Sequence, residues 1–114
     1  MVPEDADNYL AQIYRVLKNN GMCFATFFIL DNESKQLLET NDCLKFKYDM
    51  GNHVLHNRKV KEANVAYKKD FLMKMIEETH FQIENVFYGY WPGRKPEECV
   101  DFQDTVILRK KSID

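Results

Sequence analysis

Hydrophobic residues recur every three or four positions over residues 3–17, and a run of apolar residues follows almost at once. The first pattern is the stripe of an amphipathic helix, so residues 3–17 are predicted to be helical. The sequence NNG at 19–21 is typical of the left-handed residues that end a helix. Residues 22–30, MCFATFFIL, are apolar on both faces, which predicts a strand covered on both sides, as in a parallel sheet.

The second half of the chain shows a similar alternation of patterns. A helical stripe begins near residue 68, and residues 81–90 follow it as a predicted strand. The sequence WPGR is predicted to be a turn, because Pro92 and Gly93 suit the two central positions of a type II turn. Residues 102–110 are predicted to form a returning strand.

Residues 31–67 separate these halves and lack a strong period. They contain a weak alternating run that ends at Tyr48, and then a turn at DMGN, residues 49–52. A connection of this length inside a small domain is usually functional or partly disordered. We therefore treat residues 31–67 as an insertion into an α/β fold.

The order of the predicted elements locates a candidate site. Strand, helix and strand in succession indicate a βαβ crossover, so strands 22–30 and 81–90 are predicted to run parallel and to end at the same edge of the sheet. Residues 31–67 leave from the first strand end, and the segment FYGYWPGR, residues 87–94, leaves from the second. In open α/β sheets ligands bind outside the carboxyl ends of the strands, so we expect a binding site between these two loops.

Composition narrows the class of protein. The chain has 114 residues, of which 45% are hydrophobic and 30% are charged, which is typical of one soluble domain. A net charge of −2 favours neither nucleic acid nor an anionic membrane as a partner. No apolar run approaches the ~20 residues of a membrane span. The three cysteines form no CxxC pair and are treated as structural, and with no apolar leader they favour a reduced, cytoplasmic location.

Residues 9–30, YLAQIYRVLKNNGMCFATFFIL, resemble a segment of the class I S-adenosylmethionine-dependent methyltransferases. In that family a helix ends in a turn similar to RVLKPGG and leads into a strand. Here RVLK and Gly21 match, whereas Asn19 and Asn20 replace the usual Pro-Gly. Downstream, the sequences VAYKKDFL, FQIENVFYG and QDTVILRK are similar, in this order, to the last helix of that fold and to its closing antiparallel strand pair.

The resemblance implies a partial Rossmann-like sheet and methyl transfer from S-adenosyl-L-methionine to a small-molecule acceptor. That family holds the donor with a glycine-rich turn and with an acidic residue after its second strand, and neither has a counterpart here, since the four glycines form no GxGxxG turn. Residues 1–114 are therefore interpreted as one C-terminal methyltransferase-like subdomain whose glycine-rich N-terminal half is absent, with residues 31–67 as an acceptor-side insertion. The chain alone is expected to be an incomplete enzyme. The rival hypothesis is a non-enzymatic α/β interaction module derived from that fold.

The strand order of the family also predicts an exposed edge. The closing strand, 102–110, is expected between the other two strands, so the opposite edge of residues 22–30 is expected to lack a neighbour. An exposed apolar edge is a template for pairing with another chain. Self-association through residues 22–30 is therefore predicted.

The resemblance further implies that loops at the carboxyl edge build the acceptor pocket. The substrate-side candidates are four residues that follow the second parallel strand and one at the start of the last strand: Tyr88, Tyr90, Trp91, Arg94 and Asp104. The alternative is that the aromatic residues cap the hydrophobic core and that Arg94 is solvated. Gln103 and Asp104 are expected to point to opposite faces, so that one reaches the pocket and the other satisfies backbone groups of a loop.

His53 and His56 form an HxxH pair within the insertion. A metal site needs three or four convergent ligands, and no cysteine or carboxylate is spaced to complete one, so no metal is expected. A general base for the acceptor is one role for these histidines, because histidine titrates near neutral pH, and an exposed loop position is the other. The basic residues between 45 and 61 are interpreted as a solvated face, or as attraction for an acidic acceptor, rather than as a nucleic-acid surface.

Overall fold

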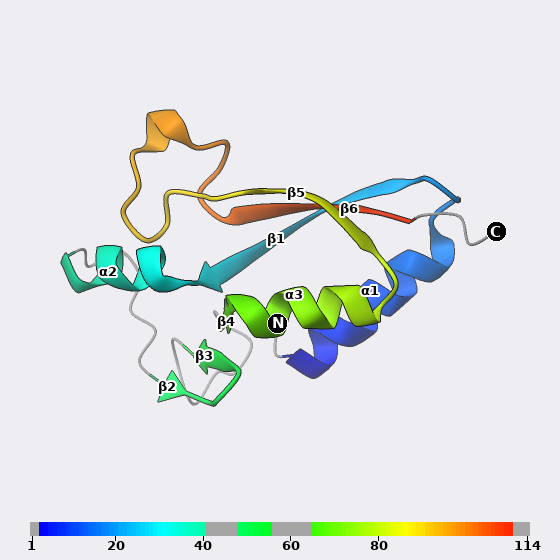
Figure 1. Ribbon diagram of the computed structural model, residues 1–114, viewed down its shortest axis with the longest axis horizontal. Helices are drawn as coiled ribbons and strands as arrows, with labels where there is room; N and C mark the ends of the chain where they lie inside the picture. The colour runs from blue at the N-terminus through cyan, green and yellow to red at the C-terminus, as the bar shows by residue number, and fades with distance from the viewer. Residues whose placement is uncertain (1–2, 41–47, 56–64, 111–114) are drawn as a thin grey trace.

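The computed structural model describes residues 3–40, 48–55 and 65–110, which form a mixed α/β fold (Figure 1). In chain order the elements are α1 (Pro3–Val16), β1 (Met22–Leu30), α2 (Asn32–Thr40), β2 (Tyr48–Asp49), β3 (His53–Leu55), β4 (Val65–Lys68), α3 (Lys69–Glu78), β5 (Gln82–Phe87), the 3-10 helix η1 (Pro96–Glu98) and β6 (Asp104–Arg109). In the described part of the chain, no helix combines the length and the apolar character that a membrane span requires.

Helix α1 and strand β1 lie where the sequence predicts them. Acidic residues occupy the first turn of α1 and Arg15 its last turn, which complements the helix dipole. Asn20 then adopts a left-handed backbone conformation with a φ of 67°, which allows the chain to turn from the helix into the strand. The second half of β1 is buried on both faces from Phe27 to Leu30, and this burial explains the apolar run in the sequence.

The six described strands form one sheet with the order β2-β3-β4-β1-β6-β5. Strand β6 is antiparallel to both of its neighbours: Phe24 of β1 lies opposite Ile107, and Ile107 lies opposite Asn85 of β5. Strands β1 and β5 are therefore parallel, which confirms the prediction from the crossover pattern. The returning strand lies between them, as expected, and the carboxyl ends of β1 and β5 lie at one edge of the sheet.

The segment between β1 and α3 differs from the predicted insertion. It contributes α2 and the strands β2, β3 and β4, and the turn predicted at residues 49–52 joins β2 to β3. Strand β4 pairs in parallel with β1, with Phe28 opposite Ala66 and Leu30 opposite Lys68. The prediction that this edge of β1 lacks a neighbour is thus wrong for residues 28–30. Self-association through the remainder of the edge stays a prediction.

Two layers of side chains cover the sheet. Alternate residues of β1, such as Phe27 and Ile29, face a core formed with α1 and α3. The intervening residues, Phe28 and Leu30, face a second core that contains Trp91 and is joined by Leu38 of α2. Figure 1 shows α1 and α3 together on one side of the sheet, with the connection between β5 and β6 on the other.

Candidate functional site

The carboxyl ends of the neighbouring parallel strands β1 and β4 form the clearest candidate site. The helix that follows β1, α2, packs on the face that contains Trp91, whereas α3, which follows β4, packs on the opposite face. In open α/β sheets, a crevice that binds ligands forms where successive connections leave to opposite faces. A cavity of about 650 Å³ lies at this point, and small-molecule sites usually have volumes of about 300–1,000 Å³.

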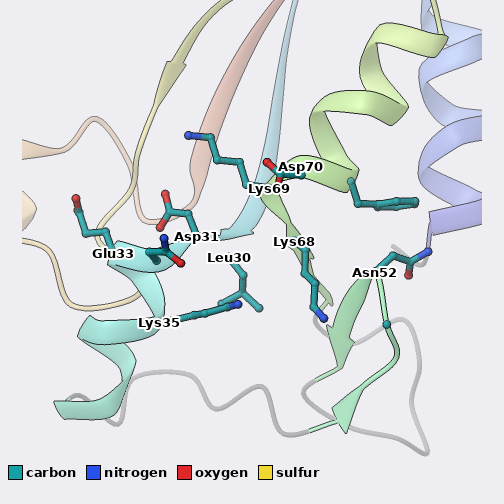
Figure 2. Close-up of a pocket in the computed structure, with 11 residues that line it drawn as sticks. Leu30, Asp31, Glu33, Lys35, Asn52, Lys68, Lys69 and Asp70 are labelled. Atoms are coloured by element: carbon teal, nitrogen blue, oxygen red, sulfur yellow. The ribbon is translucent and has the colours of Figure 1, made fainter.

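Side chains from three parts of the chain line this cavity (Figure 2). They come from the end of β1 with the start of α2, from the turn between β2 and β3, and from the junction of β4 with α3. The lining residues are Leu30, Asp31, Asn32, Glu33, Lys35, Gly51, Asn52, Lys68, Lys69, Asp70 and Phe71. Three are acids and three are lysines, so the cavity presents groups of both charges to a ligand.

Asp31 closes the N-terminus of α2 at the rim of the cavity. Its Oδ1 accepts a hydrogen bond of 2.8 Å from the backbone nitrogen of Ser34, and its own backbone nitrogen donates one of 2.8 Å to Ser34 Oγ. The serine hydroxyl is buried and also donates to the carbonyl oxygen of Ile29 at 3.2 Å. This reciprocal cap explains why a helix begins directly after a buried strand, and it holds the Asp31 carboxylate in a defined place.

Lys69 brings the ends of three parallel strands into contact. Asp31, Lys69 and Tyr88 are the first residues after β1, β4 and β5, respectively. The Lys69 amino group lies 5.5 Å from the centroid of the Tyr88 ring. The Tyr88 hydroxyl beside it, and then the carboxylates of Asp31 and Asp70, raise the pKa of the Lys69 ammonium. Lys69 is therefore a positive charge at the site rather than a base.

A buried carboxylate, Asp104, holds the connection between β5 and β6 against β1. Its Oδ2 accepts hydrogen bonds from the backbone nitrogen of Ile29 at 2.7 Å and from Trp91 Nε1 at 2.8 Å. Its Oδ1 accepts one from the backbone nitrogen of Gly89 at 2.7 Å and lies 3.8 Å from Arg94 Nη1. Burial raises the pKa of Asp104, although these donors and the Arg94 charge oppose the shift.

Arg94 joins the same connection to α2. Its Nε donates to Glu33 Oε1 at 2.7 Å, its Nη1 donates to the carbonyl oxygen of Gly89 at 3.0 Å, and its guanidinium lies 4.9 Å from the centroid of the Tyr88 ring. The side chain is only 13% exposed. Its Nε and Nη1 donors thus contact the protein itself, so Arg94 supports the shape of the site, and the alternative in which Arg94 is solvated is wrong.

The structure brings four of the five predicted substrate-side residues together, but in an internal network. Trp91 and Asp104 are fully buried and offer no surface to a ligand, so both serve the packing of the connection. The ring of Tyr90 packs against Phe102 at a centroid distance of 5.3 Å. Tyr88 is half-buried, and its ring lies beside Lys69, a residue that lines the cavity.

The predicted turn at WPGR is displaced by one residue. The backbone nitrogen of Gly93 donates to the carbonyl oxygen of Tyr90 at 3.0 Å, so Trp91 and Pro92 occupy the central positions instead of Pro92 and Gly93. The physical reason is tertiary, because Asp104 draws the indole of Trp91 into the core. The connection is also longer than a tight turn and contains the 3-10 helix η1.

Of the two histidines of the HxxH pair, only His53 lies among the described residues. His53 lies on β3, where its Nδ1 makes a hydrogen bond with Asn52 Oδ1 and its ring lies 6.4 Å from that of Tyr67. His56 and the basic residues between 56 and 61 lie outside the described residues, as do Lys45 and Lys47. Within the described ranges, no group of three or more histidine, cysteine or acidic side chains is placed to hold a metal ion.

Sequence reasoning located this edge of the sheet but missed most residues that line the cavity. The segments DNESK and KKD, which begin at residues 31 and 68, supply all six charged lining residues. Each segment lies at the end of a buried strand, and polar residues at such a strand end were the signal that could have identified them. The second segment was missed because β4 was not recognised as a strand.

Gly89 offers a direct test of how tightly this connection packs. A Cβ at this position would lie 2.2 Å from the carbonyl oxygen of Phe102 and 2.4 Å from that of Gln103. Gly89→Ala is therefore expected to lower the free energy of unfolding by about 1–3 kcal/mol or more, as judged by urea denaturation.

Gly51→Ala is the matched control, because Gly51 has a φ of +96° but, among the described residues, no atom within 4 Å of the added carbon. The free energy of unfolding of this variant should fall only by the cost of the left-handed backbone strain, about 1–2 kcal/mol. If Gly89→Ala lost no more stability than Gly51→Ala, the close approach of the backbone to Gly89 would be contradicted.

No protein-family model matches this sequence, and no solved structure gives a significant match to the chain. The functional interpretation therefore depends on the sheet, the cavity and the residues around them.

Proposed function

We propose that this chain is the C-terminal, acceptor-binding part of a class I S-adenosyl-L-methionine-dependent methyltransferase that acts on a small molecule. The observation that carries the proposal is the strand order β1-β6-β5, in which the last strand inserts antiparallel between two parallel strands. The closing strands of that family have this order. The matching sequences RVLK, FQIENVFYG and QDTVILRK fall at the end of α1, on β5 and on β6. On this proposal, the sheet is the closing part of a Rossmann-like fold.

The residues of this chain do not fit the methyl donor. A glycine-rich turn lets backbone approach the donor closely, but here the turn after β1 is closed by the cap between Asp31 and Ser34. The turn after β4 carries Lys69 and Asp70 instead of glycine. Donor binding is therefore assigned to residues outside this chain.

The role of this chain is to position the acceptor. Methyl transfer from an activated donor depends mainly on the orientation of the acceptor, because the acceptor atom must be aligned with the bond that breaks. The Asp31 carboxylate, fixed by its cap, and the Lys69 ammonium beside Tyr88 stand at the carboxyl edge where such an acceptor would lie. The backbone positions of these residues are set by the sheet, because each is the first residue after a strand.

The proposal predicts methyl transfer once a donor-binding half is supplied. The chain would be fused to the C-terminus of the glycine-rich half of a class I methyltransferase. The joined protein would then be incubated with S-adenosyl-L-methionine labelled in the methyl group, together with small amines, phenols and carboxylic acids. We expect label in at least one small molecule with the joined protein and none with the chain alone. Calorimetric titration with S-adenosyl-L-homocysteine is the folding control, and only the joined protein should bind.

A joined protein that binds S-adenosyl-L-homocysteine but labels no acceptor would contradict the proposal. Saturable binding by the chain alone would contradict the assignment of the donor site to other residues. Recording the mass of the chain by light scattering during the titration separates a site within one chain from a site completed across a dimer.

A second function, that of a protein-interaction module, is favoured by one observation. The face of the sheet that contains the Trp91 core also carries hydrophobic residues that this core does not cover. Met22 is 48% exposed, Phe24 66% and Phe87 39%. Phe24 and Phe87 share this face, because their strands pair through Ile107 and Thr105 of β6. Exposed apolar groups of this kind mark interaction surfaces. Failure of methyl transfer would favour this alternative.

A further inference from the structure

Strands β1, β6 and β5 present one face of the sheet that the described helices leave open. Helices α1 and α3 pack on the opposite face, and α2 joins the Trp91 core near the carboxyl ends of the strands (Figure 1). Beyond that core, two rows of side chains cross the three strands, and we call these six residues the open face. One row is Phe24, Ile107 and Asn85, and the other is Thr26, Thr105 and Phe87.

The composition of the open face does not fit a surface that is built to contact water. A solvated sheet face usually carries polar side chains, in alternation with the apolar side chains of the covered face. Here none of the six side chains is charged, and Phe24 is 66% exposed and Phe87 39%. Neighbouring exposed apolar groups mark interaction surfaces. The open face is therefore expected to be covered by a partner.

The charges that border the open face at the start of β1 are paired within the chain. Arg109 Nε donates to Glu84 Oε1 at 2.7 Å, and Arg109 Nη2 donates to Met22 Sδ at 3.1 Å. The Nη1 of the same guanidinium donates to the carbonyl oxygen of Asn20 at 2.9 Å. A strongly charged partner thus gains little attraction at this border, whereas a second copy of the same uncharged face meets no like charge on it.

The side chains of the open face also match one another in size under a two-fold rotation. Phe24 on β1 and Phe87 on β5 occupy diagonal corners of the two rows. The shorter Thr26 and Asn85 occupy the other two corners. If two copies face each other across a two-fold axis along β6, each phenylalanine lies over a shorter side chain of the second copy. Large and small side chains then interdigitate, as they do between facing sheets about 10 Å apart.

We propose that two copies of this chain form a symmetric dimer through the open face, with β6 of each copy at its centre. Its polar residues suit this contact, because each threonine hydroxyl both donates and accepts hydrogen bonds. Asn85 Oδ1 already accepts from the backbone nitrogen of Val86 at 2.8 Å, which leaves the amide nitrogen of Asn85 as the donor. Such a two-fold contact requires a surface that is complementary to itself.

The proposed dimer differs from the self-association predicted from the sequence, because it uses the face of β1 instead of its edge. It goes beyond the proposed function, since it needs neither a methyl donor nor an acceptor. Six side chains form a small interface, so a Kd on the order of 100 µM is expected.

The test measures the mass of the chain by analytical ultracentrifugation at concentrations from about 10 µM to about 1 mM. We expect the mass to rise from that of one chain toward that of two. Phe24→Lys places a charge between the facing sheets and should weaken association at least about tenfold. Thr26→Lys is a second variant with the same expected direction, because Thr26 is exposed and its replacement disturbs no core contact.

Val16→Lys is the matched control. Val16 is also 66% exposed, but it lies at the end of α1, where a lysine complements the helix dipole. This variant should associate as the unmodified chain does. Far-UV circular dichroism checks that each variant is folded.

NMR on a mixture of isotope-labelled and unlabelled chains identifies the contact between copies. We expect contacts between copies among the side chains of Phe24, Phe87 and Ile107. Contacts between the backbone amides of residues 22–27 of the two copies would mean that the edges pair, and would overturn the inference.

A folded chain that remains monomeric at about 1 mM would also overturn the inference. Equal weakening by the open-face variants and by Val16→Lys would do the same. These outcomes are independent of methyl transfer. A dimer of this kind would stand even if the joined protein labelled no acceptor, which would contradict the proposed function alone.

Discussion

Replacing Asp104 with alanine is expected to lower the free energy of unfolding by about 3–5 kcal/mol. The variant leaves three buried donors without their acceptor: the backbone nitrogens of Ile29 and Gly89, and Trp91 Nε1. It also removes the carboxylate that lies 3.8 Å from Arg94. An unpaired buried donor costs about 1–3 kcal/mol, and three such donors would account for the loss even after partial relaxation.

Urea denaturation followed by the fluorescence of Trp91, the only tryptophan, measures this loss. Asp104→Asn keeps the shape but turns an amide NH₂ toward one set of donors, so an intermediate loss is expected. Asp101→Ala is the matched control, because Asp101 is exposed in the same connection and its side chain accepts a local hydrogen bond from the backbone nitrogen of Phe102. Similar losses for Asp101→Ala and Asp104→Ala would show that Asp104 does not hold the connection in place.

Trp91→Ala is expected to lower the free energy of unfolding by about 3–5 kcal/mol, because a large and fully buried side chain would leave a cavity. The indole packs edge-on against Phe28, with ring centroids 5.2 Å apart, and belongs to the core formed with Leu30 and Ala66. This core joins the connection after β5 to β1. Its loss is therefore expected to loosen the carboxyl edge of the sheet as well as to reduce global stability.

Trp91→Phe separates packing from hydrogen bonding. Phenylalanine retains an aromatic ring but cannot donate to Asp104, so a loss of about 1–3 kcal/mol is expected. Far-UV circular dichroism is the readout, since both variants remove the only tryptophan. Phe24→Ala, at an aromatic residue that is 66% exposed, should cost less than about 1 kcal/mol. A loss at Trp91 no larger than that at Phe24 would mean that the second core contributes little to stability.

The local sequence pattern was sufficient to predict those elements whose buried side chains recur at a regular spacing. The stripe of α1 and the apolar run of β1 both gave the correct bounds to within one residue. Strand β4 has only four residues and runs directly into α3, so no local period distinguishes it from the helix. What makes Val65–Lys68 a strand is its pairing with Phe28–Leu30, which are distant in the sequence.

The predictions made from the sequence for the candidate site agree with the structure only in part. It placed the site at the carboxyl edge, because two parallel strands must end there, and it allowed that Asp104 satisfies loop backbone. It offered Trp91 as a wall of the pocket and, as the alternative, as part of the hydrophobic core, and the buried indole beside the Asp104 carboxylate agrees with the alternative. Lys35 of α2 and Lys68 of β4 were not identified, because nothing in the local sequence of either lysine indicates that both line one cavity.

The sequence by itself determined the helix–strand alternation, the parallel relation of β1 and β5 and the antiparallel return of β6, since these follow from periodicity and crossover rules. Only the tertiary structure decided which side chains meet. The pairing of β4 with β1, the hydrogen bonds to Asp104 and the gathering of lysines around one cavity all join residues far apart in the chain. Such contacts depend on how both faces of the sheet are packed, and no local pattern contains that information.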